Sequence, residues 1–214
     1  ENYIRTLDRN AYFELTSYTT DDIKRNEMYK ANIERIRNEK AFTNYSEYLL
    51  SLEMTAMIDK FDEVSLSRIV QLTNKSNQFN LTTRRYTMNE MEEVFKDDSY
   101  IKIYGRLCDK FGDNGIVSVV IGKIKDDCLH IDLWLMSCRV LKREMEYAML
   151  DSLVEICKKN GLSKIYGYYY KTAKNAMVKN LFSDFGFDKT NEDENENASF
   201  VLEINNHKSK KRAT

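Results

Sequence analysis

The chain has 214 residues, a formal net charge of −1 and a hydrophobic content of 42%. This balance creates no overall field that would favour nucleic acid or an anionic membrane. No apolar run reaches the roughly 18–20 residues that span a bilayer. We therefore expect neither a nucleic-acid nor a membrane partner. The length of the chain suits one buried domain with an appendage, or two small domains.

Residues 1–52 have a helical pattern throughout. Thr20-Asp21-Asp22 is a helix N-terminal signal, because acidic residues favour the positive end of the helix dipole. The predicted helix runs to about Lys40 and has a thin apolar stripe, which is typical of a helix that packs on another domain. A shorter helix is expected over Tyr45–Leu52. Since the chain opens with Glu1 rather than Met, we expect a piece of a longer polypeptide.

Strands join the pattern from residue 53. Met54–Phe61 is a predicted strand, and Ser65–Leu72 is a predicted short helix with Ser65 as its N-cap. Two longer strands follow, Tyr100–Lys110 and Ile116–Lys125. They flank the loop Phe111–Gly115, whose Asn-Gly pair is typical of a β-hairpin.

A strand, a helix and a second strand are predicted over residues 128–170. In Cys128–Cys138 the odd positions are aliphatic and the even ones mixed, which predicts one apolar face and one chemically capable face. Helix-period apolar residues follow from Met145, and Asn160-Gly161 supplies a left-handed stop. With the β-rich run Lys164–Tyr170 this makes a βαβ unit of two parallel strands. A site is expected at the end of its first strand, around residues 137–139.

The chain closes with a predicted helix over Ala173–Phe185, ended by Gly186, and a last strand over Ser199–Ile204. Residues 207–214 are expected to form a disordered tail. The order of elements from residue 53 predicts an α+β fold, with a mixed, mostly antiparallel sheet and one parallel pair.

The four cysteines are scattered, without a Cys-x-x-Cys pair, and the chain has only two histidines. They are Cys108, Cys128, Cys138 and Cys157. Zinc sites need closely spaced Cys and His ligands, so we expect no metal site. Free thiols in strand and helix patterns favour a reducing, cytoplasmic setting.

The element order and the local sequence resemble the GNAT acyltransferase fold. Lys174–Phe187 (KNAMVKNLFSDFGF) is similar to the closing motif of that family, with Asn and Ala early in a helix, then an apolar pair, then Gly-Phe. Four stretches resemble the C-terminal GNAT-like domain of FkbH-type proteins: QLTNKSNQFNLTTRRY, DKFGDNGIVSVVI, IDLWLMSCRVLKREME and YYKTAKN. The resemblance covers roughly Phe61–Phe187.

The resemblance implies a division of the chain and a set of partners. Residues 1–52 would be the helical connector from a missing N-terminal HAD-like phosphatase domain, and residues 53–206 the GNAT-like domain. FkbH-type proteins are associated with loading a glyceryl unit from a bisphosphoglycerate onto an acyl carrier protein, towards polyketide extender units. The implied cofactor is the phosphopantetheine arm of that carrier or coenzyme A.

Two features depart from the GNAT pattern. GNAT enzymes hold the pyrophosphate of coenzyme A on backbone N–H groups of a Gly-rich loop after the fourth strand. Here Lys142 and Glu144 stand where that pattern has Gly, so Arg139, Lys142 and Arg143 would attract an anion through their side chains. Phe182 replaces the Tyr that protonates the leaving thiolate in many acetyltransferases. Acetyl-CoA-dependent N-acetylation is therefore disfavoured, and a docking module without chemistry is the alternative to acyl transfer.

Cys138 is the main catalytic candidate. Its thiol could accept an acyl group as a thioester and pass it to a phosphopantetheine thiol, helped by Arg139 and a helix N-terminus. The alternative is a buried thiol that packs the end of the strand. His130 is eight residues away, roughly 26 Å along a straight strand, so no Cys–His dyad is expected.

Asp132 and His130 would share the mixed face of the same strand, about 6–7 Å apart, and could act as a base and its orienting partner. They could equally be polar groups on a solvated strand face. Trp134, predicted on that face too, would line a pantetheine channel or pack in the core.

Amide and hydroxyl side chains are unusually dense in Gln71–Tyr86. Buried amides must be paired, so the cluster either lines a polar site or braces an irregular loop. As a polar site, it would provide acyl or acceptor contacts from Asn77, Gln78 and Asn80, and phosphate contacts from Arg84 and Arg85. Lys174 and Asn175, at a helix start, would bind the cofactor or cap the helix.

Overall fold

The structure is a computed structural model that describes residues 20–209, with the side chains of residues 27–209. The chain divides into two compact units, Glu1–Thr43 and Asn44–Thr214. In the first unit, helix α2 (Thr20–Glu39) forms where the sequence predicts it and has three exposed apolar side chains: Tyr29, Ile33 and Ile36. No described helix is long and apolar enough to cross a membrane.

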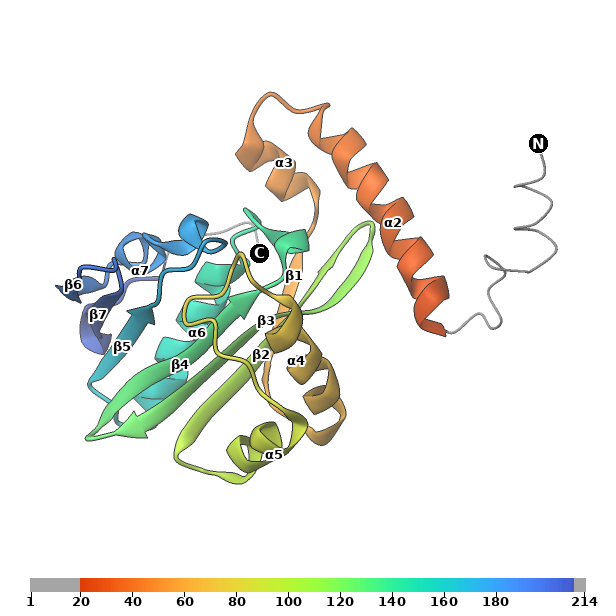
Figure 1. The fold of residues 1–214 in the computed structure, drawn as a ribbon. Helices are drawn as coiled ribbons and strands as arrows, with labels where there is room; N and C mark the ends of the chain where they lie inside the picture. The colour runs from red at the N-terminus through yellow and green to blue at the C-terminus, as the bar shows by residue number, and fades with distance from the viewer. Residues whose placement is uncertain (1–19, 210–214) are drawn as a thin grey trace, which may run out of the picture. The chain divides into compact units, whose positions relative to one another are not determined.

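The second unit is built on a seven-stranded sheet in the order β1-β2-β3-β4-β5-β7-β6 (Figure 1). Its strands are β1 (Thr55–Lys60), β2 (Tyr100–Asp109), β3 (Gly112–Lys125), β4 (Cys128–Met136), β5 (Lys164–Tyr169), β6 (Asp188–Glu192) and β7 (Ala198–Glu203). Every neighbouring pair is antiparallel except β4 and β5, which are parallel. The predicted α+β fold with its mixed sheet is therefore confirmed.

Helices cover both faces of this sheet (Figure 1). The helices are α3 (Tyr45–Ser51), α4 (Glu63–Lys75), α5 (Met88–Lys96), α6 (Met145–Lys159) and α7 (Leu181–Asp184), with short 3-10 turns η1 (Cys138–Val140), η2 (Ala176–Val178) and η3 (Ile204–Asn206). α4 and α5 share a core cluster with Tyr104 of β2. α6 lies on the opposite face, because its Met145 and Met149 pack against Gly105. The sheet is thus a middle layer between α4 and α5 on one side and α6 on the other.

The N-terminus of α4 differs from the prediction. Asp62 is the N-cap, and its carboxylate accepts a hydrogen bond from the backbone N–H of Ser65 at 2.8 Å. Ser65 lies inside the helix and its hydroxyl accepts from the Asp62 N–H, which completes a capping box. Thr87 and Glu90 form a second capping box at the start of α5, a helix that the prediction omitted although the signal is present.

The hairpin turn also differs. β2 and β3 pair as far as Asp109 and Gly112, so the turn is Lys110-Phe111 and the predicted loop at Phe111–Gly115 is wrong. Asn114 lies inside β3 at a register shift, where its buried amide donates to the Leu107 carbonyl at 3.1 Å. The Asn-Gly signal marks an irregularity in the strand because Gly115 has a φ of 69°.

The helix predicted near the C-terminus of the unit is interrupted in the structure. The helix expected over Ala173–Phe185 is split into η2 and α7, and Gly186 ends it with a φ of 85°.

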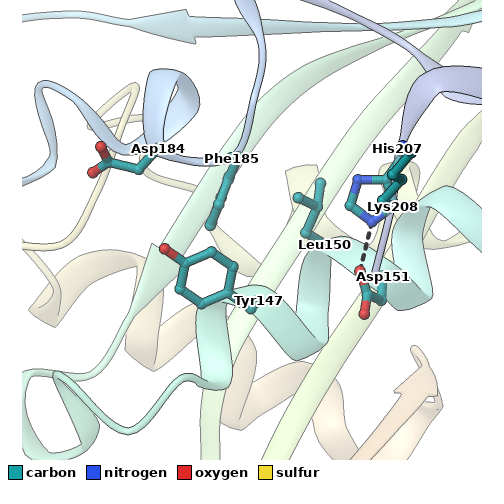
Figure 2. Close-up of a pocket in the computed structure, with 7 residues that line it drawn as sticks. All are labelled: Tyr147, Leu150, Asp151, Asp184, Phe185, His207 and Lys208. Carbon is teal, nitrogen blue, oxygen red and sulfur yellow. Dashed lines mark hydrogen bonds and ion pairs between the residues drawn. The ribbon is translucent and has the colours of Figure 1, made fainter. Parts of the chain in front are cut away.

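Of the tail expected to be disordered, residues 207–209 are described. His207 Nε2 lies 2.6 Å from Asp151 Oδ1 on α6, beside a cavity of about 20 Å³ that would hold one water molecule (Figure 2). Residues 210–214 lie outside the described part.

Candidate functional site

A bulge in β4 decides which side chains face which side of the sheet. Ile121 pairs with Leu133 and Gly122 with Ile131, so Asp132 is an extra residue on β4. Leu133 therefore packs in the core beneath α4 and α5. The predicted strict alternation is wrong beyond Asp132, because the bulge resets which positions point to each face.

β4 and β5 are paired only over their first residues, from Cys128 opposite Lys164 to His130 opposite Tyr166. Beyond the bulge, the edge of β4 that faces β5 has a different partner: residues Phe79–Thr82 of the loop between α4 and α5, which we call the strap. The strap runs antiparallel to β4, with Asn80 opposite Leu135.

Four hydrogen bonds hold the strap between the two diverging strands. Towards β4, Leu81 N–H donates to the Trp134 carbonyl at 3.1 Å and the Phe79 carbonyl accepts from Met136 N–H at 3.0 Å. The Thr82 hydroxyl donates to the Asp132 carbonyl at 2.7 Å. Towards β5, Tyr170 N–H donates to the Leu81 carbonyl at 2.9 Å. The opening that would otherwise separate β4 from β5 is filled by the chain itself.

Asn175 clamps the strap from the other side. Its side chain is 0% exposed, and its Nδ2 donates to the carbonyls of Asn80 at 3.0 Å and Tyr170 at 2.9 Å. Its Oδ1 accepts from the Thr172 N–H at 2.8 Å. With both ends of its amide engaged by the protein, Asn175 has a structural role here, and the cofactor contact expected of it is not supported by this geometry.

Asn80 braces the loop in the same way. Its Nδ2 donates to the Ser76 carbonyl at 3.2 Å and its Oδ1 accepts from the Thr83 N–H at 2.9 Å. Because Asn80 is buried and fully engaged, the geometry favours the bracing alternative over a substrate contact for this residue.

The other residues expected to touch substrate or cofactor are more open. Asn77 accepts a hydrogen bond from the exposed Arg85 at 3.1 Å. Gln78 and Lys174 are exposed. Their binding roles stay predictions. The structure brings Asn77 and Arg85 together at the outer end of the strap's loop.

Asp132 and His130, expected to act as a base and its orienting partner, are hydrogen-bonded to other residues. Asp132 instead forms an ion pair with Arg84 at 2.9 Å, and the Arg84 guanidinium lies 4.7 Å from the centre of the Tyr86 ring. The carboxylate therefore ties the strap's loop to the bulge of β4.

His130 belongs to an aromatic row on β4 and β5. A hydrogen bond of 2.7 Å joins its Nδ1 to the Tyr168 hydroxyl, and its ring stacks on Tyr166 with centroids 4.8 Å apart. Burial and, to a lesser degree, Lys125 lower the pKa of His130, so the neutral imidazole is favoured. Tyr166, Tyr168 and Tyr170 were missed in the sequence, although their spacing of two residues in a strand indicates one shared face.

Trp134 lies on the face opposite His130, because the bulge falls between them. Its ring is fully buried, 5.2 Å from Phe185 and edge-on to Phe182 at 6.2 Å. The pantetheine-channel reading of Trp134 is therefore wrong and the core alternative is correct. Phe182 in turn lies flat on Gly167, where an added Cβ would be 2.5 Å from its ring.

Two residues of the loop after β4 have positive φ angles of the kind that Gly usually adopts, although neither is Gly. Lys142 and Glu144 have φ angles of 63° and 61°, in the left-handed region that favours Gly. Cys138, at the start of this loop, has an exposed thiol, so the buried alternative does not apply to it. The Nε of Arg139 donates to the Ser137 hydroxyl at 3.3 Å.

Two contacts pin this loop from outside. Arg143 Nη1 lies 3.0 Å from Asp109 Oδ2 at the hairpin, with side chains 9% and 0% exposed. The Tyr45 hydroxyl of α3 donates to the Lys142 carbonyl at 3.0 Å. Arg143 is thus buried against a carboxylate, and the anion contact expected of its side chain is not supported by the geometry. Among the described residues, no group of three or more His, Cys, Asp and Glu side chains could hold a metal ion.

Solved structures share this arrangement over most of their length. The chain is similar to the ribosomal-protein-S18-alanine N-acetyltransferase from Escherichia coli, at 12% identity and a TM-score of 0.53, covering 70% of this chain and 94% of that one. An acetyltransferase of the GNAT family from Streptococcus pneumoniae gives 13% identity, a TM-score of 0.53, and coverage of 70% and 99%. The fold is that of the GNAT family.

A spermidine N-acetyltransferase from Vibrio cholerae in complex with CoA and spermine has the same GNAT fold, at 10% identity and a TM-score of 0.53, with 70% of this chain and 96% of that one covered. The sequence matches no protein-family model, and the search of curated proteins gave no match. The GNAT-like fold expected from the sequence is therefore established by structure, while the resemblance to FkbH-type proteins stays a prediction.

Proposed function

We propose that the second unit is an acyltransferase domain of FkbH type, which transfers a glyceryl unit to the phosphopantetheine thiol of an acyl carrier protein. The observation that carries the proposal is the exposed Cys138, two residues after the end of β4 and beyond the point where β4 and β5 part. In this reading Glu1–Leu52 leads from a HAD-like phosphatase domain, and the protein acts in the cytoplasm.

The reaction would be two successive acyl transfers. The Cys138 thiolate attacks the acyl carbon of an acyl phosphate of glycerate; the C–S bond forms, and phosphate leaves with the electron pair of the broken C–O bond. The thiolate of the carrier arm then attacks the thioester carbon, and Cys138 leaves as a thiolate. Each thiol gives up its proton to solvent beforehand, which suits an exposed sulfur without a His partner.

Coenzyme A is the alternative cofactor, since a solved structure of similar fold is in complex with it. The strap already pairs with the edge of β4, Lys142 and Glu144 add side chains to the loop after it, and Phe182 offers no proton to a thiolate. These three features favour a second candidate function, a docking module without chemistry that positions a carrier protein for a neighbouring phosphatase domain.

The test is an intact-mass measurement. The chain is incubated with a phosphopantetheinylated acyl carrier protein and the acyl phosphate of glycerate. Adducts are then sought on both proteins. We expect a glyceryl adduct on the chain and on the carrier, with the first lost in Cys138→Ala. Cys108→Ala, at a half-buried thiol of the hairpin, is the matched control and should keep the adduct.

The outcomes separate the candidates. Carrier binding without an adduct on Cys138 would support the docking module. Binding of free coenzyme A together with acetylation of amines would contradict both candidates and support an N-acetyltransferase.

A further inference from the structure

Three segments of the second unit form a closed ring of contacts around the loop after β4. The first contact joins helix α3 to the loop, because the Tyr45 hydroxyl donates to the Lys142 carbonyl at 3.0 Å. The second joins the loop to the β2–β3 hairpin, through the pair of Arg143 with Asp109 at 3.0 Å. The third joins the hairpin to α3, where the backbone N–H of the residue after β2 donates to the Leu52 carbonyl at 2.9 Å. Each segment is therefore held by the other two.

This ring of contacts holds two residues in an unfavourable backbone conformation. Lys142 and Glu144 have left-handed φ angles of 63° and 61°, which are costly for a residue with a side chain. Such residues persist only where the surrounding structure over-determines the backbone, and they concentrate at functional sites. The Tyr45 hydroxyl bonds to the first of the two, and the Arg143 pair holds the residue between them.

Tyr45 holds the loop from a well-anchored helix. Its ring centroid is 5.6 Å from that of Tyr48, one turn further along α3, and Tyr48 is buried. The helix begins after Asn44, whose side chain accepts a hydrogen bond from the Ser46 N–H at 2.9 Å. Tyr45 itself is 41% exposed, so Tyr45→Phe would remove a hydrogen bond and little packing.

We propose that Tyr45 is a positioning residue for Cys138: it holds Lys142 in its left-handed conformation and thereby fixes the loop in which Cys138 lies. The inference rests on the proposed function, and it adds α3 to the parts of the chain that serve the reaction. Cys138 opens the short 3-10 turn η1, which leads directly into the held segment. Because a misplacement of about 1 Å can cost roughly a hundredfold in rate, the reaction depends on a fixed loop.

The first experiment measures the rate of acyl transfer by intact mass. Tyr45→Phe should slow the formation of the Cys138 adduct roughly threefold to tenfold, as expected for one lost hydrogen bond. Alkylation of Cys138 by iodoacetamide needs only an exposed thiol and should keep its rate. In a Lys142→Gly background, Tyr45→Phe should have little further effect, because Gly adopts this φ without support. Tyr104→Phe, which removes a hydroxyl bond to Asp62 at the start of α4, is the matched control and should change neither rate.

A second measurement does not depend on the reaction. Hydrogen exchange is followed by NMR at Tyr147 and Ala148, whose N–H groups donate to the Glu144 carbonyl in the first turn of α6. Tyr45→Phe should raise exchange at both amides several-fold, because the loop that ends at Glu144 is held less firmly. Lys142→Gly should reverse the rise, and amides in the first turn of α5 should not change.

The outcomes separate this inference from the proposed function. Adduct formation in Tyr45→Phe at the native rate, or an equal loss of rate with Lys and with Gly at position 142, would overturn the inference alone. No adduct on the native chain would overturn the acyl relay and, with it, the part of Tyr45 in that reaction. Unchanged exchange at Tyr147 and Ala148 in Tyr45→Phe would overturn the hold of α3 on the loop, whatever the reaction.

Discussion

The two halves of β4 have different partners on the same edge. Over Cys128–His130 the partner is β5, and the pairing follows from the βαβ unit that the local sequence builds. Over Asp132–Met136 the partner is the strap, which comes from about fifty residues earlier in the chain. The bulge at Asp132 is the boundary. One edge of β4 is therefore paired with a strand at one end and with a loop segment at the other.

The largest expected effect concerns the loop that follows the second half of β4. An ion pair attaches this loop to the β2–β3 hairpin. Arg143→Met removes the charge that compensates Asp109, whose side chain is 0% exposed. Removing one partner of a buried ion pair costs about 3–5 kcal/mol of unfolding free energy, to be measured by urea denaturation. Arg106→Met breaks the exposed pair with Asp113 on the same hairpin and should cost less than about 1 kcal/mol. Equal losses of unfolding free energy in the two variants would contradict a larger contribution from the buried Arg143–Asp109 pair.

A smaller effect of opposite sign is expected within the same loop. Lys142→Gly should stabilise the protein by about 0.5–1 kcal/mol, because Gly adopts a φ of 63° without the steric cost that Lys bears. Lys174→Gly is the control: this exposed residue is not among the described residues with positive φ, so Gly there should destabilise. A loss of thermal stability in Lys142→Gly would contradict the left-handed backbone at this position.

The smallest effect concerns the first half of β4. The pKa of His130 is lowered in the folded state by burial and Lys125, against the opposing effect of Asp126 and Asp132. Protonation therefore favours the unfolded chain, so stability is full above the ordinary His pKa of about 6.5 and falls as the pH drops below it. His130→Phe should make the decline in unfolding free energy between pH 7.5 and 5 shallower.

His207 is the control for that measurement, since burial lowers its pKa too. His207→Gln should remove its own share of the pH dependence and leave that of His130. A slope that is unchanged in His130→Phe would show that the stack on Tyr166 imposes no cost on the charged ring.

The elements that the sequence predicted well are those whose signals are local. The βαβ unit, the stop at Gly161 with a φ of 71°, and the last strand depend on neighbours within a few turns. The capping box of α5 is equally local and was available to prediction.

The site was harder, because its decisive contacts join distant residues. Asn175 and Asn80 are 95 residues apart, and Arg143 and Asp109 are 34 apart. Residue type alone does not reveal which buried amide or guanidinium is already engaged by the protein. The bulge at Asp132 depends on the register with β3, which explains why His130 and Trp134 were placed on one face and lie on two.

Leu81 joins the two sides of the sheet through a single residue. Its N–H bonds to β4 and its carbonyl to β5, at the end where those strands have separated. The block β1–β4 and the block β5–β7 are thus fastened at both ends, directly at residues 128–130 and through Leu81 at the other. Loss of the two Leu81 backbone bonds would leave the direct pairing of β4 with β5 at residues 128–130 as the backbone connection between these blocks.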